Sequence, residues 1–548
     1  MKNLVKQFTF LLALVGMIST TVAQQAAKPA KDQLAETYSR QSVTFFMGSL
    51  PGVNAAPVNN VGKIKFSDKY FNHNLDNQVL QLGQEFKTLT FDKKKAYLQD
   101  LLTKQGVGRQ MVAKWFNRQA NGMMSLEYIH KSGLYNATDQ DVKMAVAAKR
   151  GDAFLKDAGQ NLVNKTSVLI LVPYDVKSKE DKDSRSWDCS YDMFCFQLVF
   201  TPDVVANFYN VWPYDDDDAA IKQSKVAAFD TLTFKFSEIK SSPFLSSSAS
   251  DIITKLKKTK TFDELAAELV NKMYESSTFT LDRTIEDFRV KTKVSQIHPT
   301  RAKIGKKEGL KCDQQFFVFQ YTYDEATKKV TPVRKAVIRA TSKIADNRTI
   351  ATGSSPESKF YQTYGGTVEA GMILQQRLDF GISLMPGFAV GGIGGLEANL
   401  MFRTGPYSNV TALYVIGDFG IDGGNFKTSF NSTSTKYNFT RMAGGLGKGF
   451  RFARIVEFTP YAMYGVESTK DKTYESISTT YGKLGAMLGF NITHNVSVFG
   501  QANYYIMGNA TVKKTKDSTE ESAYKGSWDS YFTGRNGVSM KFGLRFEF

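Results

Sequence analysis

The chain has 548 residues, of which 42% are hydrophobic, 13% aromatic and 22% charged, and its net charge is +17. This composition is too apolar for a disordered chain, and no run of ~18 apolar residues is present that could cross a bilayer as a helix. Three cysteines and four histidines exclude a cysteine-based zinc ribbon and a dense disulfide scaffold, and leave little material for histidine-rich metal chemistry. The length predicts roughly two to four domains, and we expect no cofactor.

The N-terminus has the pattern of a secretory signal peptide. Two lysines precede an apolar stretch at residues 8–18, and small residues follow at 21–23. We therefore expect a signal peptide at residues 1–23 and a mature chain that begins near Gln24. No cysteine lies near this cleavage site, so we expect no lipid anchor there.

Composition and periodicity divide the remaining chain into regions. Residues 251–350 carry a net charge of +8, and 29 of the 42 glycines follow residue 350. Helical patterns followed by strand patterns predict an α+β domain at the start. The expected regions are an α+β domain at 24–250, a helical connector at 251–288, a small β-domain at 289–350, a linker at 351–365 and a β-rich region at 366–548.

Individual elements follow from the spacing of apolar residues, which is three to four in helices and two in half-buried strands. The expected helices before residue 290 are 91–105, 108–121, 141–163, 248–258 and 261–276. The expected strands before residue 350 are 168–172, 196–200, 229–236, 316–323 and 330–341. The last two strands flank a polar loop and are predicted to form a hairpin.

From Phe380 onward, apolar residues alternate with polar or small residues. The final segment, from Val538 to Phe548, shows this most clearly. Since successive side chains of a strand point to opposite faces, each such segment has one apolar and one polar face. We expect eight strands, near residues 380–390, 396–405, 410–421, 437–451, 456–467, 481–493, 496–508 and 537–548.

A soluble β-sandwich would show the same alternation, but three further features favour a membrane barrel. The segments have the length that a tilted strand needs to cross a bilayer. The chain ends inside the last segment, on the aromatic residue Phe548. The connections also alternate in length, as in outer-membrane barrels: short at 405–409, 452–455 and 493–496, and longer and polar at 422–436, 469–480 and 509–536.

The final sequence VSMKFGLRFEF resembles the assembly signature of bacterial outer-membrane β-barrel proteins, and residues 365–548 resemble their small eight-stranded members. The resemblance implies a closed antiparallel transmembrane barrel in the outer membrane, in contact with outer-membrane lipid and inserted by the barrel assembly machinery. An even number of strands places both ends of the barrel on one side, and short turns are typical of the periplasmic side. We therefore expect the N-terminal region in the periplasm.

The interior of the expected barrel is predicted to be filled. An eight-stranded barrel is only just wide enough for its own side chains. The inward positions carry charges of both signs, so we expect internal ion pairs rather than a pore. These positions are Glu397, Arg403, Lys483, Gln501, Asn503, Lys541, Arg545 and Glu547.

Cys189 and Cys195 lie six residues apart beside strand-forming residues. In an oxidising periplasm we expect a disulfide between them that ties a hairpin, and a metal site is less expected without nearby histidines. Cys312 is left over and is expected to be a buried thiol.

One basic cluster invites two interpretations, a solvated lysine-rich face or a surface that contacts anionic lipid head groups or an envelope polymer. Nucleic acid is not an expected partner of an exported chain. The cluster comprises Lys291, Lys293, Arg301, Lys303, Lys306, Lys307 and Lys311.

Other charged and glycine-rich motifs favour structural roles. Asp215–Asp218 lacks the spacing and the glycine of a Ca²⁺ loop and is expected to be an exposed acidic loop. Gly445–Gly449 lacks the Ser or Thr of a phosphate loop, so we expect small residues where a barrel strand bends. His298 has no evident catalytic partner, and no nucleophile elbow or HExxH motif is present.

These observations lead to three hypotheses about function. The first is a non-enzymatic outer-membrane protein whose barrel anchors a periplasmic region that acts as a scaffold or binds a periplasmic protein or envelope polymer. The second is a narrow channel or solute-binding outer-membrane protein. The third is a periplasmic hydrolase domain tethered to a barrel.

Overall fold

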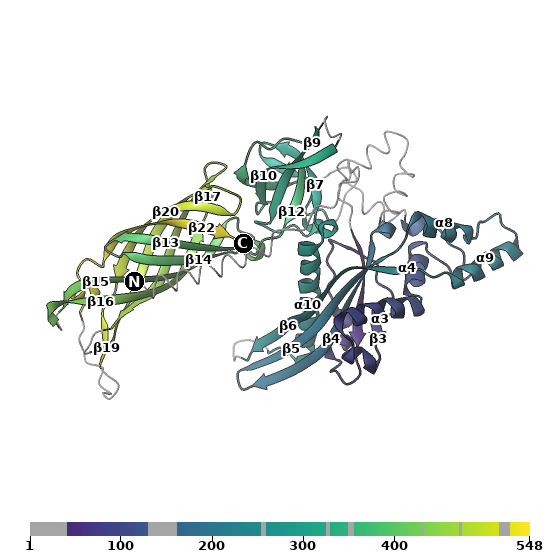
Figure 1. The fold of residues 1–548 in the computed structure, drawn as a ribbon, viewed down its shortest axis with the longest axis horizontal. Coiled ribbons are helices and arrows are strands. Elements are labelled where there is room, and N and C mark those ends of the chain that lie inside the picture. The colour runs from purple at the N-terminus through teal and green to yellow at the C-terminus, as the bar shows by residue number, and fades with distance from the viewer. Residues whose placement is uncertain are drawn as a thin grey trace. The chain divides into compact units, whose positions relative to one another are not determined.

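The computed structural model describes residues 41–129, 162–253, 259–324, 329–348, 356–428, 431–470, 474–514 and 526–548. It contains an N-terminal α/β region, a closed six-stranded barrel and a closed eight-stranded antiparallel barrel (Figure 1). The predicted signal peptide and most of the predicted helix at 141–163 lie outside the described residues. No helix within the described ranges is long and apolar enough to cross a membrane.

A six-stranded sheet forms the centre of the α/β region. Strand β1 is parallel to β2, β3 and β4, whereas β5 is antiparallel to both of its neighbours, β4 and β6. The sheet has the order β2 (Phe71–Asn72), β1 (Ser42–Ser49), β4 (Thr166–Asp181), β5 (Ser184–Leu198) and β6 (Phe236–Ile252), and β3 (Val79–Gln81) also pairs with β1.

Helices pack on both faces of this sheet, which explains why the central strands are apolar on both sides. Residues of α3 (Phe91–Lys104), α4 (Val107–Trp115), α8 (Pro202–Asn210) and α9 (Ala219–Thr231) share one core with the sheet. The opposite face packs against α10 (Phe262–Thr284). Short helical turns are α2 (Ala56–Asn59), η1 (Val61–Lys63), η2 (Gln84–Thr88), η3 (Glu286–Phe288) and η4 (Lys306–Glu308).

Helix α10 starts where its sequence supplies a capping box. The Thr261 hydroxyl accepts a hydrogen bond from the Glu264 N–H, and the Glu264 carboxylate accepts one from the Thr261 N–H. These two bonds satisfy N–H groups that the first helical turn leaves without intrahelical partners. The predicted helix at 261–276 is therefore confirmed at its start.

Two elements of this region differ from the sequence prediction. The predicted strand at 229–236 is wrong except at Phe236, because α9 continues to Thr231 with Phe229 buried in it, and β6 begins only at Phe236. The predicted helix at 248–258 is wrong over 248–252, because these residues belong to β6 and pair with β5. Pairing with a neighbouring strand outweighs the weak helical spacing of this serine-rich segment.

The six-stranded barrel contains the two predicted hairpin strands. Two of its strands lie beyond the predicted small β-domain at 289–350. Its core includes Phe316, Ile338, Phe360 and Leu374. In order around the barrel the strands are β10 (Lys329–Ala340), β11 (Ser358–Gly365), β8 (Thr300–Ala302), β7 (Lys291–Ile297), β12 (Ile373–Arg377) and β9 (Gln315–Asp324). Strand β11 lies where a linker was predicted, because only pairing with β10 and β8 makes this polar segment a strand.

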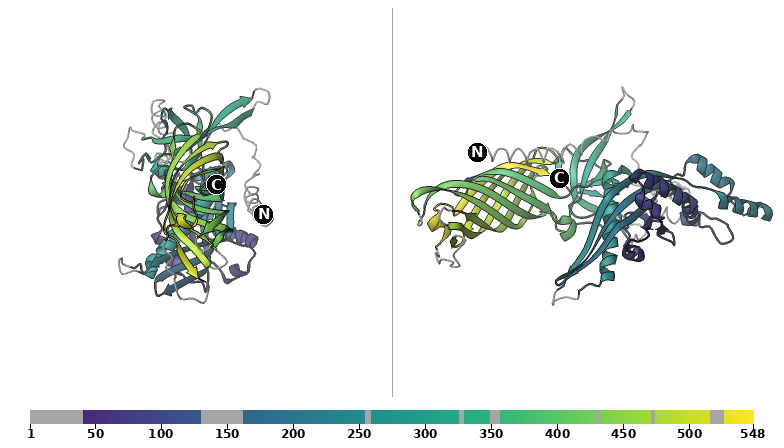
Figure 2. Two further views of the ribbon diagram at one scale, coloured as in Figure 1. Left: turned by 90° about the vertical axis from the view of Figure 1, so that its left-hand side faces the viewer. Right: turned by 60° about the horizontal axis from the view of Figure 1, so that its bottom comes forward.

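All eight predicted strands of the C-terminal barrel are present. Each pairs with its sequence neighbour, and the first and last strands pair with each other, which closes the barrel (Figure 2). The strands are β13 (Ile382–Gly391), β14 (Gly395–Arg403), β15 (Leu413–Thr428), β16 (Asn431–Lys448), β18 (Val456–Thr469), β19 (Tyr474–Asn491), β20 (Val496–Met507) and β22 (Gly537–Glu547). Short connecting elements are α11 (Gly405–Ser408), β17 (Phe450–Arg451), β21 (Thr511–Lys514) and α12 (Trp528–Tyr531).

The polar segments predicted as long loops at 422–436 and 469–480 are largely strand. Strands β15 and β16 remain paired as far as Thr428 and Asn431, and β18 and β19 as far as Thr469 and Ile477. These parts of the strands need no apolar face if they extend beyond the lipid, which explains why their polar sequence suggested loops. The connection at 509–536 is long, as predicted.

The outer face of the barrel is apolar and exposed. Phe388, Leu400 and Phe542 are 54–58% exposed, although each has buried neighbours in its own strand. Further exposed apolar residues are Val415, Phe419, Met442, Leu446, Tyr464, Leu484, Leu488, Val498, Tyr504, Val538, Met540 and Leu544. Such a band suits lipid tails, and closure leaves no strand edge without hydrogen-bond partners.

Candidate functional site

The barrel has two ends, which we call proximal and distal. At the proximal end the chain enters β13 and leaves β22, and the Phe380 N–H donates to the Phe548 carbonyl at 2.9 Å. The distal end carries the connection between β20 and β22 and the extended parts of β15, β16, β18 and β19. The side chains at both ends and in the lumen determine whether a solute could pass through the barrel.

A buried ion-pair network fills the lumen towards its distal half. Lys483 Nζ lies 2.6 Å from Glu397 Oε1 and 2.7 Å from Asp418 Oδ2. Lys541 Nζ donates to Asn399 Oδ1 at 2.6 Å and lies 3.5 Å from Glu397 Oε1. All five side chains are almost fully buried. Buried charges are tolerated when paired in this way, whereas losing one partner is costly.

A second network lies towards the proximal half. Glu457 accepts hydrogen bonds from the Tyr414 hydroxyl at 2.9 Å and from Arg545 at 3.2 Å, and Arg451 also contacts its carboxylate. Arg545 is in addition 2.7 Å from Glu547. Charges of opposite sign from β17, β18 and β22 thus meet across the lumen, together with the neutral Tyr414 hydroxyl of β15.

The predicted inward residues all lie in these networks or beside them. Glu397, Lys483, Lys541, Arg545 and Glu547 form ion pairs. Gln501 bonds to Asn399, Asn503 to Tyr461, and Arg403 stacks on Tyr414. The prediction of a filled lumen with internal ion pairs is confirmed.

Sequence reasoning missed several other members of the lumen network. Asp418, Arg441, Glu457 and Glu467 are all buried within predicted strands. Their signal was available, because each is a charged residue on the polar face of an alternating segment.

A cap from the connection between β20 and β22 closes the distal end. The Trp528 indole N–H donates to Glu467 Oε1 at 2.8 Å. Arg535 donates to Glu467 Oε2 at 2.6 Å and to Asp422 at 3.0 Å, and its guanidinium lies 3.6 Å from the centroid of the Phe439 ring. Trp528 and Phe532 are completely buried in an aromatic cluster with Tyr437 and Phe439. We call residues 526–535 the distal cap.

Buried polar contacts join the six-stranded barrel to the proximal end. Asp313 accepts hydrogen bonds from the Ala412 N–H at 2.7 Å and from the Tyr361 hydroxyl at 2.8 Å. A Cβ atom at position 405 would lie 2.3 Å from Asp313 Oδ2, so only glycine fits there. Burial raises the pKa of Tyr361 well above its usual value, which keeps this hydroxyl a neutral donor.

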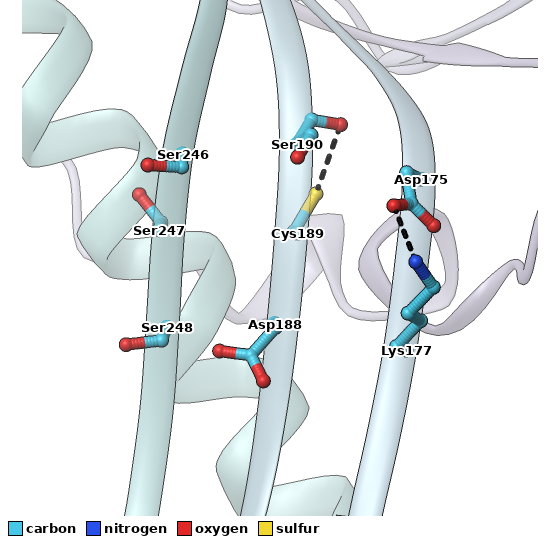
Figure 3. A pocket seen from close by; sticks show the side chains of 8 residues that line it. All are labelled: Asp175, Lys177, Asp188, Cys189, Ser190, Ser246, Ser247 and Ser248. Carbon is cyan, nitrogen blue, oxygen red and sulfur yellow. Dashed lines mark hydrogen bonds and ion pairs between the residues drawn. The ribbon is translucent and has the colours of Figure 1, made fainter.

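A shallow pocket of about 280 Å³ lies on the extended part of the α/β sheet (Figure 3). It is lined by Asp175 and Lys177 of β4, Asp188, Cys189 and Ser190 of β5, and Ser246, Ser247 and Ser248 of β6. Asp175 and Lys177 pair with each other at 2.8 Å. Burial raises the pKa of Cys189 to about 12, so this thiol is not an activated nucleophile, and the lining residues hold no histidine to act as its base.

The predicted disulfide between Cys189 and Cys195 is corrected by the structure. Both thiols are free and buried, and both belong to β5. Six residues along a strand span ~20 Å, far beyond the ~6 Å between Cα atoms that a disulfide allows. The β4–β5 turn lies near residue 182, so both cysteines stand on the same side of it. Cys312 is a buried thiol, as expected.

The predicted basic cluster is not fully available to a partner. Lys307 is buried, Lys291 pairs with Glu286 at 3.0 Å, and Lys306 pairs with Asp346 at 3.2 Å. Lys293, Lys306 and Lys311 are exposed, while Arg301 and Lys303 are half-buried. Contact of this cluster with an anionic surface remains a prediction for its exposed members, and the structure removes Lys307 from it.

The other motifs occupy structural positions. Asp217 pairs with Lys225 at 2.7 Å and accepts the Tyr214 N–H, and Asp218 precedes α9. Across the described part of the chain, no group of His, Cys, Asp and Glu could hold a metal ion. Gly445 lies in β16 against the backbone of β18, where a Cβ atom would be 2.1 Å from the Ala462 carbonyl.

Comparison with known proteins gives matches to solved structures alone, because no family model and no curated protein matches the sequence. The barrel is similar to a major outer membrane protein from Thermus thermophilus, with 15% identity and a TM-score of 0.23 over 30% of this chain and 98% of that one. Ail from Yersinia pestis in a phospholipid bilayer nanodisc gives 18% identity and a TM-score of 0.19 over 30% and 98%. CarO2 from Acinetobacter baumannii gives 11% identity and a TM-score of 0.17 over 31% and 100%. The similarity is one of barrel fold alone.

Closure by eight antiparallel strands, an apolar exterior and a charged interior together decide the class of the C-terminal region. It has the fold of the small outer-membrane β-barrels. In this fold a filled lumen leaves the outer surface and the connected domains as the parts that can meet other molecules.

Proposed function

We propose that this protein is a non-enzymatic outer-membrane protein whose barrel anchors a periplasmic region that acts as a scaffold or binds a partner. The supporting observation is the filled lumen. Lys483 lies between Glu397 and Asp418 in its middle, and the distal cap packs into its mouth. A lumen filled in this way favours an anchor over a conduit.

The proposed orientation places the α/β region and the six-stranded barrel in the periplasm. Both termini of an even-stranded barrel lie on one side. The six-stranded barrel precedes β13 by a short segment and contacts the proximal end through Asp313. The distal cap would then face outward.

Two measurements on the full-length protein in cells test anchoring and orientation. A folded barrel should migrate as a compact band on a gel without boiling and shift after boiling. An epitope tag placed after residue 24 should resist protease added to intact cells and be cleaved once the outer membrane is permeabilised. Recovery of the protein in a soluble fraction would contradict the anchor, and cleavage of the tag in intact cells would contradict the orientation.

The partner-binding part of the proposal needs a separate experiment. Crosslinking in intact cells, followed by purification through the tag, should recover a specific periplasmic protein or envelope polymer with the full-length chain. A control chain that carries residues 380–548 behind the signal peptide should not recover it if the periplasmic region makes the contact. Equal recovery by both chains would contradict the assignment.

A further inference from the structure

Three arginines gather where the six-stranded barrel meets the start of the membrane strands. Arg377 ends β12, and β13 begins at Ile382, so the chain itself holds Arg377 close to the proximal end. Arg334 of β10 is exposed. Arg283, at the end of α10, is also exposed and lies 4.4 Å from the centroid of the Phe380 ring.

An aromatic residue, Phe317, contacts two of these three arginines. Phe317 of β9 has Arg334 at 4.8 Å and Arg377 at 5.8 Å from its ring centroid. The His494 ring, in the proximal connection between β19 and β20, lies 5.5 Å from Phe317 in an edge-on arrangement. Phe317 therefore lies beside two guanidinium groups and contacts the proximal rim of the membrane barrel.

The positive charge of this group is not neutralised. Within the described residues, no carboxylate forms an ion pair with Arg283, Arg334 or Arg377. Asp379, the acidic group near Arg377, pairs with Arg339. The pKa of Arg377 is lowered by its partial burial and then by the neighbouring arginines, and the attraction of Asp379 only partly offsets this.

The rim around this group has the character of a membrane–water interface. Its exposed large side chains are Phe380, Tyr407, Phe450 and Phe452, which all lie in proximal connections or at the first strand. Aromatic girdles of this kind mark the level of the lipid head groups in outer-membrane barrels. The contact of Arg283 with the Phe380 ring places this arginine at head-group height, and Arg377 precedes Phe380 by three residues.

We propose that Arg283, beside Phe380, and Arg334 and Arg377, beside Phe317, bind the phosphate of an anionic phospholipid in the periplasmic leaflet. Guanidinium groups match phosphate oxygens through paired N–H donors. The acyl chains of the lipid would extend along the apolar outer face of the barrel. This assignment rests on the proposed orientation, because only that orientation places the proximal rim in the periplasmic leaflet.

The test uses full-length protein in neutral detergent, with dihexanoyl phosphatidylglycerol as the anionic probe. Dihexanoyl phosphatidylcholine and inorganic phosphate serve as comparisons, and binding is measured by calorimetry at low salt. Phosphatidylglycerol should bind more tightly than either comparison ligand. The double variant R334Q/R377Q should weaken its binding roughly ten- to thirty-fold, since each basic group near anionic lipid contributes a several-fold effect.

The matched control is K87Q/K93Q, which removes the same charge from two exposed lysines of the α/β region, outside the predicted basic cluster. It should change affinity by less than about two-fold. R334K/R377K should bind more tightly than R334Q/R377Q and less tightly than the wild type, because it keeps the charge and loses the paired donors. Equal weakening by the glutamine variant and the control would overturn the proposal, as would equal affinity for phosphatidylcholine. Binding of inorganic phosphate as tightly as the lipid would reassign the cluster to a free anion and also overturn it.

Failure here is distinguishable from failure of the proposed function. Compact migration before boiling reports the folded barrel, and tag protection in cells reports its orientation, both without reference to lipid charge. If the double variant loses compact migration, the single variant R334Q, at an exposed position, carries the test with an expected loss of roughly five-fold.

Discussion

Lys483 is a fully buried ammonium group held between two carboxylates, Glu397 and Asp418. The variant Lys483→Met keeps the length of the side chain but leaves both carboxylates in an environment that disfavours unpaired charge. We expect it to lower the free energy of unfolding by about 3–5 kcal/mol. Urea unfolding of the barrel in lipid vesicles measures this change. Lys427→Met, at an exposed position, should stay within about 0.5 kcal/mol of the wild type, and equal effects would contradict a stabilising network.

His73 is a completely buried imidazole that stacks on Trp115 at 4.2 Å, with Nε2 3.0 Å from the Met111 carbonyl. Burial lowers its pKa to about 3, against about 6.5 in an unfolded chain. The folded state therefore favours the neutral ring. Its stabilising contribution is fully present above pH ~6.5 and is lost as the pH falls towards 3, at ~1.4 kcal/mol per pH unit.

The variant His73→Phe should remove this pH dependence and keep the stack on Trp115. Between pH 7 and pH 5, we expect the unfolding free energy of the α/β region to fall by about 2 kcal/mol less in the variant than in the wild type. Urea titrations followed by tryptophan fluorescence measure both slopes. Identical slopes would show that His73 accepts a proton in the folded state.

At the scale of elements, the distal cap combines an aromatic cluster with ion pairs. Trp528→Ala removes a buried ring and its hydrogen bond to Glu467, so we expect a loss of about 3–5 kcal/mol. The temperature at which the compact gel band disappears measures the loss. Phe542→Ala, on the lipid-facing side, should lower that temperature less, because lipid tails can fill the space of the missing ring. A larger effect of Phe542→Ala would argue against the cap as a stabilising element.

The membrane strands were predictable because the two faces of each strand lie in different environments. Lipid selects apolar residues outside, and the closed lumen selects polar residues inside, so the period of two persists along β20 and β22. This rule weakens where strands need no apolar face, and the paired segment of β15 from Asp422 to Thr428 therefore suggested a loop. Strand β11 escaped prediction for a related reason, because its pairing partners decide its conformation.

Sites that depend on tertiary contacts could not be predicted in the same way. Arg283, Arg334 and Arg377 are far apart in the sequence, and no local spacing links them. The basic residues that do cluster in sequence are partly paired or buried, as Lys307 shows. Cys189 and Cys195 were misjudged because the position of the β4–β5 turn decides whether they face one another across a hairpin.

For the whole molecule, a filled lumen and a capped mouth predict the absence of conduction. Purified full-length protein inserted in planar bilayers should give no conductance steps above background in molar salt, because side chains occupy the path that ions would need. The chemically solubilised but unfolded chain serves as the control for detergent artefacts. Reproducible unitary steps from the folded protein would contradict the anchor model and favour the channel hypothesis.

The pairing of β13 with β22 joins Ser383 to Glu547, and every other pairing in the cylinder links strands that follow one another in sequence. This contact joins the strands that are farthest apart in the sequence, and we expect its formation to be the slowest step of assembly. The seven pairings between neighbouring strands can form one after another. Until β13 pairs with β22, however, both strands have unpaired edges to which other strands can bind. A crosslink engineered between β13 and β22 would consequently accelerate maturation far more than one placed between any two consecutive strands.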